Sequence, residues 1–314
     1  MMETMIDFFP ARRCVSVLLI VLVISISVSS AGERVTSGEY FVKQSWSQEN
    51  RFDRPYFVNV PTKTTKHKLP VFLFLHGNGG NGKGAMKSFL TQHRTMAENY
   101  VMVFPEGYLK SWNIVSERSK ADDLGFIEVI IERLADCENV QKNNFTIMGS
   151  SNGAALVNQL AIESRLPNIR NLITGVSPLN TFQHDGRNFR AKGENNDYGK
   201  AVTPLTGRRL MNISGTEDRL VPYQGGRSRV IPAKGGKLTF VDAEESTFRW
   251  AKAMGYKGRK LTRPSRVDGQ LSVFSYLDGN VVHYRASGEG HGATRRLTEE
   301  TLLHFLRAGI STEP

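Results

Sequence analysis

The sequence predicts one α/β domain with a mostly parallel β-sheet and helices on both of its faces. Two observations predict this: short apolar runs alternate with segments of helical periodicity, and several runs are continuously apolar. Continuous apolar runs are typical of parallel strands buried on both faces, and their alternation with helices favours a parallel sheet. The composition agrees, because 39% hydrophobic and 23% charged residues are values of a globular protein. Two cysteines in 314 residues exclude a disulfide scaffold.

In chain order, residues 1–31 are predicted to be an export signal. Arg12 and Arg13 precede the apolar stretch Val15–Val28, and small residues suited to cleavage follow it. The alternative is a retained membrane anchor, because the apolar stretch is nearly long enough to span a bilayer. We expect residues 32–314 to form a single secreted or periplasmic domain, with no stable membrane association once the signal is cleaved.

Eight apolar runs of this domain are expected to be strands. They are Tyr56–Val60, Val71–Leu75, Val101–Phe104, Phe145–Met148, Leu172–Val176, Leu210–Ile213, Leu271–Tyr276 and Val281–Tyr284. Four segments show helical spacing. They are Asp123–Ala135, Asn152–Ser164, Ala243–Met254 and Thr294–Leu306. The long polar segment Gln183–Gly207 is expected to be a functional or disordered loop.

A candidate nucleophile lies between an expected strand and an expected helix. Residues 149–153 have the pattern Gly-x-Ser-x-Gly, with Ser151 at its centre. In this strand–turn–helix setting a serine occupies a strained turn at the edge of the sheet. The two glycines allow strand and helix to turn back sharply, because a side chain at either place would clash. The alternative is an ordinary glycine-rich turn.

A glycine-rich turn after the run Val71–Leu75 is a candidate for stabilising negative charge. It begins at His76, and its backbone N–H groups could point at a developing oxyanion. We assign one donor to the backbone of Asn78, with Gly79 as the alternative, and the other donor to the backbone of Asn152. The turn lacks the Gly-Lys-Ser/Thr ending of a phosphate-binding loop. His76 is then expected to hold the turn in place.

An acid and a base are expected after the nucleophile, because a triad on such a sheet runs in the order serine, acid, histidine. Asp218 follows the end of an expected strand, and Glu217 is a weaker rival. Three histidines follow Asp218. His283 lies within a strand pattern and His304 within the last helix, whereas His291 lies in a glycine-rich loop. We therefore favour His291 as the base.

Several motifs resemble, in the same order, those of one known family. They are His76-Gly77, Pro105-Glu106-Gly107, Ser111-Trp112-Asn113, Asp122–Phe126, the Ser151 turn, Gly215–Asp218, Val221-Pro222-Tyr223 and Gly290-His291. They look like motifs of the secreted esterases that include poly(3-hydroxybutyrate) depolymerases, feruloyl esterases and acetylxylan esterases. The resemblance implies an α/β-hydrolase fold, with Ser151 as nucleophile, Asp218 as orienting acid and His291 as base.

Two departures from this family limit the resemblance. Family members often carry Gly-His-x-Trp-Pro-Gly, but Gly292-Ala293-Thr294 follows His291 here, which puts an aromatic acyl pocket in doubt. Many members also have a cysteine soon after the tryptophan that corresponds to Trp250, where this chain has Gly255-Tyr256.

The leading hypothesis is a secreted serine esterase that acts through an acyl-enzyme. A peptidase or another acyl hydrolase is an alternative, because a triad does not specify the leaving group. A non-catalytic carbohydrate-binding surface protein that kept the fold is a third. The chemistry requires no metal and no cofactor, and we expect none. Nucleic-acid binding is not expected, because no motif for it is present.

The charge of the chain suggests a substrate. The formal net charge is +11, and Arg295 and Arg296 lie soon after His291. Together with Trp112 they are our candidate substrate contacts. A positive rim would attract an anionic polymer, with an effect that weakens as salt rises. We therefore expect an ester substrate that is polymeric or anionic, such as a uronic-acid-containing polysaccharide.

Overall fold

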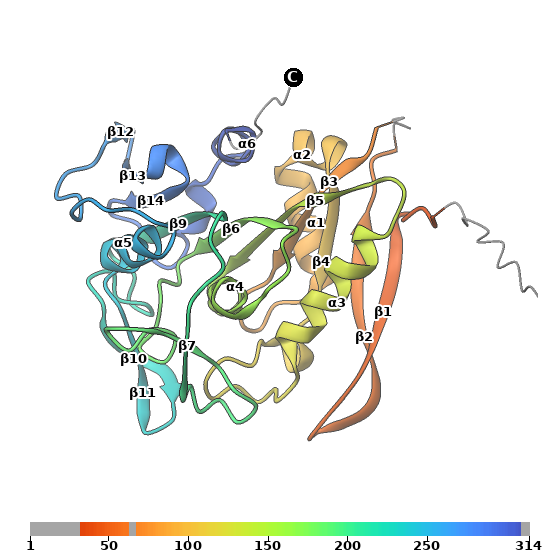
Figure 1. Cartoon of the computed structure of the whole chain (residues 1–314), viewed down its shortest axis with the longest axis horizontal. Helices are drawn as coiled ribbons and strands as arrows, with labels where there is room; N and C mark the ends of the chain where they lie inside the picture. Colours follow the sequence, from red (N-terminus) through yellow and green to blue (C-terminus); the bar gives the residue numbers. More distant parts are fainter. Residues whose placement is uncertain (1–31, 63–66, 309–314) are drawn as a thin grey trace, which may run out of the picture. The chain divides into compact units, whose positions relative to one another are not determined.

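A mixed β-sheet forms the centre of the computed structural model, which describes residues 32–62 and 67–308 (Figure 1). In spatial order its strands are β1 (Gly38–Trp46), β2 (Glu49–Asn59), β4 (Val101–Pro105), β3 (Leu69–Leu75), β5 (Val140–Ser150), β6 (Ile169–Gly175), β9 (Arg209–Gly215), β14 (Val281–Ala286), β13 (Leu271–Tyr276) and β12 (Arg266–Asp268). The strands from β4 to β14 are parallel to one another, and the pairings toward both edges are antiparallel.

Helices cover both faces of this sheet (Figure 1). One face packs against α1 (Gly82–Gln92), α2 (Arg94–Asn99) and α6 (Glu299–Arg307). The other packs against α3 (Asp123–Ala135), α4 (Asn152–Glu163) and α5 (Ala243–Ala253). The remaining elements are the 3₁₀ turns η1 (Tyr108–Lys110), η2 (Leu277–Gly279) and η3 (Ala293–Arg296), and the small hairpins β7 (Phe189–Ala191) with β8 (Lys200–Val202) and β10 (Gly226–Ala233) with β11 (Gly236–Phe240).

The central strand β3 shows why the sheet needs both layers of helices. Val71, Leu73 and Leu75 belong to the core beneath α3 and α4, whereas Phe72 belongs to the core beneath α1 and α6. Successive side chains of a strand point to opposite faces, so a continuously apolar strand is stable only with both faces covered. The sheet therefore confirms the α/β class.

All eight predicted strands are present; Leu271–Tyr276 keeps both predicted ends as β13, and each of the other seven is shifted at one or both ends. The prediction missed β1, which alternates exposed and half-buried residues at the edge of the sheet. It also missed α1, because the first seven residues of this helix include two glycines and three polar or charged residues. The predicted helix Thr294–Leu306 is instead divided into η3 and α6, because the Thr298 hydroxyl accepts a hydrogen bond from the Thr301 N–H and starts a new helix there.

The polar segment Gln183–Gly207 is partly ordered by the β7–β8 hairpin. Its Tyr198 hydroxyl donates to the Ile114 carbonyl oxygen at 2.7 Å, and the Asn196 amide donates to Asn113 Oδ1 at 2.7 Å. The segment therefore packs against the chain that follows η1.

The predicted export signal, residues 1–31, lies outside the described residues, so its cleavage or retention stays a prediction. In the part that is described, no helix combines the length and the apolarity needed to cross a bilayer.

Candidate active site

Ser151 lies at the sharp turn between β5 and α4. Its backbone has φ 54° and ψ −118°, and positive φ is uncommon for a residue with a side chain. A Cβ on Gly149 would lie 2.4 Å from the Gly153 carbonyl, and a Cβ on Gly153 would lie 2.3 Å from the Leu75 carbonyl oxygen. The pattern Gly-x-Ser-x-Gly thus reflects a real steric requirement. Strained serines of this kind concentrate at functional sites.

The structure brings Ser151, His291 and Asp218 into one hydrogen-bonded chain. His291 Nε2 lies 2.8 Å from Ser151 Oγ, and His291 Nδ1 lies 2.7 Å from Asp218 Oδ2. The Asp218 side chain is nearly fully buried, and its other oxygen accepts the N–H groups of Leu220 and Val221 at 2.8 and 3.0 Å. These two bonds fix the carboxylate so that Oδ2 faces the imidazole.

The rival acid Glu217 does not join this chain. It is exposed, and its backbone N–H donates to the Glu289 carbonyl oxygen at 2.8 Å. That bond ties the turn after β9 to the loop that carries His291. The carbonyl group of Glu289 also approaches a Cβ built on Gly215 to 2.3 Å, so the two segments touch where only glycine fits.

Neither rival histidine joins this chain of contacts. His304 is exposed on α6. His283 is fully buried in β14, where Nδ1 lies 2.7 Å from Asn212 Oδ1 and Nε2 lies 2.9 Å from the Tyr223 hydroxyl. Burial, assisted by the charge of Arg285, lowers the pKa of His283 to about 3. His283 is therefore neutral and structural.

The lowered pKa of His283 predicts a loss of stability in acid. The folded state keeps this imidazole neutral while the unfolded chain gains a proton below about pH 6.5. Stability is thus complete above pH 6.5 and falls as the pH drops toward 3. Between pH 7 and pH 5 this group should remove about 2 kcal/mol from the free energy of unfolding. Denaturant titrations at both pH values measure it. The pH dependence should shrink in His283→Gln and persist in the exposed control His304→Ala; equal slopes in all three proteins would contradict the assignment.

The turn after β3 offers two alternatives for the first oxyanion donor, the N–H groups of Asn78 and Gly79. The Gly79 N–H donates to the Lys110 carbonyl oxygen at 2.8 Å, so it is already occupied. Among the described residues no acceptor is bonded to the Asn78 N–H. Gly77, on the same turn, would bring a Cβ to 3.5 Å from the Ser151 Cβ. The geometry therefore favours Asn78 over Gly79, with the Asn152 N–H at the start of α4 as the second donor.

His76 holds this turn, as the sequence predicted. Its Nε2 accepts the Gly107 N–H at 3.0 Å, so the proton is on Nδ1, which donates to the Gly77 carbonyl oxygen at 2.8 Å. Burial lowers the pKa of His76, which agrees with a neutral ring that donates once and accepts once.

Trp112 is not a substrate contact, and that prediction is wrong. The side chain is fully buried, and its indole N–H donates to the His76 carbonyl oxygen at 2.8 Å. The Asn152 side chain binds the Trp112 backbone twice, accepting its N–H at 2.7 Å and donating to its carbonyl oxygen at 3.0 Å. Trp112 thus connects the two segments that carry the candidate oxyanion donors.

Glu117 is a site residue that the sequence did not reveal. One carboxylate oxygen accepts the N–H groups of Ile114 and Val115 at 2.8 and 2.7 Å, and the other accepts from the Asn152 amide at 3.2 Å. Burial raises the pKa of this carboxyl group. Glu117 belongs to no catalytic motif; only the packing around Asn152 identifies it.

The side chain of Asn152 should therefore position its own backbone N–H. We expect Asn152→Ala to lower kcat by about tenfold or more while changing KM little, because a misplaced oxyanion donor affects mainly the transition state. Steady-state kinetics on a simple ester test this. Ser111→Ala is the graded control, since it removes only one contact to the Asn152 amide oxygen, at 3.2 Å. Equal losses of kcat in the two variants would contradict this role.

The two arginines after His291 differ in their surroundings. Arg296 forms an ion pair with Glu289, which compensates its charge. Arg295 is exposed, and its guanidinium lies where a Cβ on Gly292, the residue after His291, would be. Within the described residues Arg295 has no carboxylate partner, so it is the better candidate for meeting a substrate.

Neither a family model nor a curated protein sequence matches this chain. Solved structures do. An acetyl xylan esterase from Aspergillus awamori shares 15% identity at a TM-score of 0.55, over 85% of this chain and 99% of that one. Thermogutta terrifontis esterase 2, phosphorylated by paraoxon, shares 12% identity at a TM-score of 0.54, over 90% of this chain and 98% of that one. Likeness at these identities shows the fold, which is the α/β-hydrolase fold predicted from the sequence.

Proposed function

We propose that this chain is a serine hydrolase of carboxylic esters. The observation that carries the proposal is the continuous hydrogen-bonded chain from Ser151 through His291 to Asp218, with the serine on a strained turn. A serine activated by an adjacent base, which a third group orients, has the arrangement of an acyl-transfer nucleophile.

In the first half of the proposed reaction His291 Nε2 takes the proton of Ser151 as its Oγ bonds to the ester carbonyl carbon. The negative charge that develops on the carbonyl oxygen is held by the N–H groups of Asn78 and Asn152. Asp218 keeps the proton on Nδ1, so that Nε2 faces the serine. The intermediate then breaks its bond to the alcohol oxygen, which receives the proton from His291.

In the second half a water molecule replaces the alcohol. His291 accepts a proton from the water, whose oxygen bonds to the acyl carbon and displaces Ser151 Oγ, and the proton passes from His291 to the serine. The products are the free acid and the original enzyme. Apart from the ester and the water, both steps use only groups of this chain.

The acyl group and the leaving group are tested together by a hydrolysis panel. We propose polyester or polysaccharide-linked acyl esters as substrates, and the panel compares p-nitrophenyl acetate, methyl ferulate, acetylated xylan and short hydroxybutyrate oligomers. Preferential hydrolysis of a peptide or anilide would favour the alternative of a peptidase or another acyl hydrolase. No turnover of any member, together with carbohydrate binding, would favour the non-catalytic alternative.

An anionic substrate remains a narrower proposal, supported by the exposed guanidinium of Arg295, which lies against Gly292, the residue after His291. We expect Arg295→Ala to lower kcat/KM for an anionic ester about threefold at low salt, and to have less effect at high salt or on a neutral ester. The measurement compares the two esters at two salt concentrations. Lys142→Ala is the control, because Lys142 is an exposed cation near the start of β5, at the opposite end from Ser151. Equal responses of the two variants would contradict the proposal.

Export from the cytoplasm is proposed from the signal-like residues 1–31 alone. The mature enzyme would then act outside the cytoplasm on an extracellular or periplasmic ester, and a retained signal would anchor it to the membrane. N-terminal sequencing of the protein from its native source distinguishes the two.

A further inference from the structure

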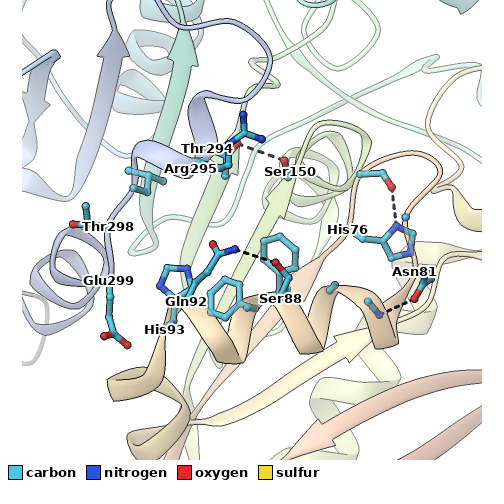
Figure 2. A pocket seen from close by; sticks show the side chains of 17 residues that line it. His76, Asn81, Ser88, Gln92, His93, Ser150, Thr294, Arg295, Thr298 and Glu299 are labelled. Atoms are coloured by element: carbon cyan, nitrogen blue, oxygen red, sulfur yellow. Dashed lines mark hydrogen bonds between the residues drawn. The ribbon is translucent and has the colours of Figure 1, made fainter.

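The positive charge of the chain is concentrated in one stretch. Residues 219–267 contain twelve lysines and arginines but only three acidic residues, so they contribute +9 of the net charge of +11. Elsewhere cations and carboxylates nearly balance. Figure 2 shows an example, a groove that is lined by the cation Arg295 and by the carboxylate of Glu299. The charge of the protein is therefore strongly asymmetric along the chain.

The three acidic residues of this stretch are already paired. Their N···O distances to lysine or arginine are 3.1 to 3.4 Å, in the pairs Glu245–Arg249, Glu245–Lys260, Asp242–Lys260 and Glu244–Arg285. The other ten cations of residues 219–267, all except Arg249 and Lys260, are exposed. Within the part of the chain that the structure describes, none of them forms an ion pair. We call these ten side chains the basic face.

The basic face lies on one side of the domain. In Figure 1 the elements of this stretch, β10, β11, α5 and β12, lie at the left, opposite the edge formed by β1 and β2. Like charges that are gathered on one side repel one another and lower the stability of the fold. The core does not require these cations, because all ten are exposed. An anionic partner would offset the repulsion.

The uncharged residues of the same stretch indicate which kind of partner. Leu220, Val230 and Val267 are 38%, 52% and 65% exposed, and they are three of the five exposed large hydrophobic side chains among the described residues. No aromatic side chain of residues 219–267 is exposed, although stacking on nucleic-acid bases would require one. Exposed aliphatic groups gain from insertion between lipid chains, whereas a hydrated acidic polymer offers them no apolar surroundings. We propose that the basic face binds a membrane surface rich in anionic lipid.

The hairpin of β10 and β11 is the part of the basic face that is best shaped for this contact. Four of its cations and Val230 are exposed, and only Ser228 of β10 is buried. The Ser228 hydroxyl donates to the Leu220 carbonyl oxygen at 2.7 Å, which fixes the hairpin to the segment after Asp218. The cations would meet lipid headgroups while Val230 reaches the acyl boundary. Binding of this kind is reversible and weakens with salt, unlike the anchoring that a retained signal would provide.

Vesicle binding of the full chain tests the proposal. We expect a partition coefficient at least about tenfold higher on phosphatidylcholine vesicles with about 30% phosphatidylglycerol than on pure phosphatidylcholine, because each cation near an anionic surface adds to the attraction. The difference should narrow as salt is raised. Equal binding to both kinds of vesicle at low salt would overturn the proposal. The measurement needs no substrate, so failure of the esterase function would leave it unaffected.

Removal of the hairpin cations should abolish most of this preference. The variant carries Arg227→Gln, Arg229→Gln, Lys234→Gln and Lys237→Gln, all at exposed positions. We expect it to bind the anionic vesicles about thirtyfold more weakly than the wild type does. Its melting temperature should be almost unchanged, because the four side chains belong neither to the core nor to the catalytic site.

A matched control removes the same charge elsewhere. Lys68→Gln, Lys87→Gln, Arg94→Gln and Lys142→Gln together replace four exposed cations outside the basic face. This variant should retain most of the binding to the anionic vesicles. Equal losses in the two fourfold variants would show that only the net charge matters, and would overturn the proposal.

Val230→Ser distinguishes a lipid surface from a soluble acidic polymer. It keeps every cation but removes an exposed aliphatic side chain, so it should weaken binding to the anionic vesicles about threefold or more. Binding to polygalacturonate, which offers charge without acyl chains, should not change. Vesicle binding that Val230→Ser leaves unchanged, and that polygalacturonate abolishes by competition, would overturn the membrane proposal in favour of an acidic polymer.

Discussion

Replacement of Ser151 by alanine should lower kcat/KM for p-nitrophenyl acetate by at least about three orders of magnitude, because loss of a triad nucleophile removes the covalent pathway. The fold should survive. Ser151 is only half-buried, and its side chain makes one hydrogen bond, to His291. Its strained φ of 54° is retained by alanine at a similar cost. The expected result is thus an inactive protein with an almost unchanged melting temperature.

A control serine and the melting curve make this prediction specific. Ser287 is exposed in the turn after β14, and its backbone N–H, which an alanine keeps, donates to the Gln270 carbonyl oxygen. Ser287→Ala should therefore retain wild-type kinetics. Activity of Ser151→Ala within tenfold of wild type, in a protein with normal melting, would show that the nucleophile lies elsewhere.

Replacement of His291 by alanine should cause a loss of comparable size, since without the base Ser151 cannot release its proton. His304→Ala removes an exposed histidine from α6 and should retain full activity. The activity of the wild type should also fall in acid, because a protonated imidazole cannot accept the proton of the serine. Kinetics of the three proteins across a pH series provide the measurement. An active His291→Ala together with an inactive His304→Ala would assign the base to α6.

The parts of the fold that could be predicted are the strands whose burial is evident in the local sequence as a continuous apolar run. The central strands are buried on both faces, so their apolar runs were visible without any knowledge of contacts. The edge strand β1 and the helix α1 contain no such apolar run. In α1, Gly82 is required because a Cβ there would lie 2.7 Å from the Phe104 carbonyl oxygen, and this tertiary contact cannot be inferred from a glycine-rich sequence.

In the candidate site, too, some residues could be identified from the local sequence and others only from contacts in the fold. The positions of Ser151, Asp218 and His291 followed from chain order and from strand ends, and the structure places all three in contact. Trp112 was misjudged because a motif marks a position without showing where its side chain points. The choice between Asn78 and Gly79 depended on one hydrogen bond, from Gly79 to Lys110.

Glu117 is the converse case, a site residue that the sequence did not predict. Its carboxylate matters only because the fold buries it beside Asn152. Nothing in the neighbouring sequence distinguishes it from the many exposed glutamates of the chain.

Fluorophosphonate labelling followed by peptide mass spectrometry tests the central claim most directly, because the reagent reacts with an activated serine and leaves an ordinary one unmodified. The account predicts one label per chain, on the peptide that contains Ser151. It also predicts that denaturation before labelling, or the His291→Ala substitution, abolishes the reaction. A folded protein that takes up no label, or that carries the label on a different serine, would contradict the assignment of Ser151 as the nucleophile.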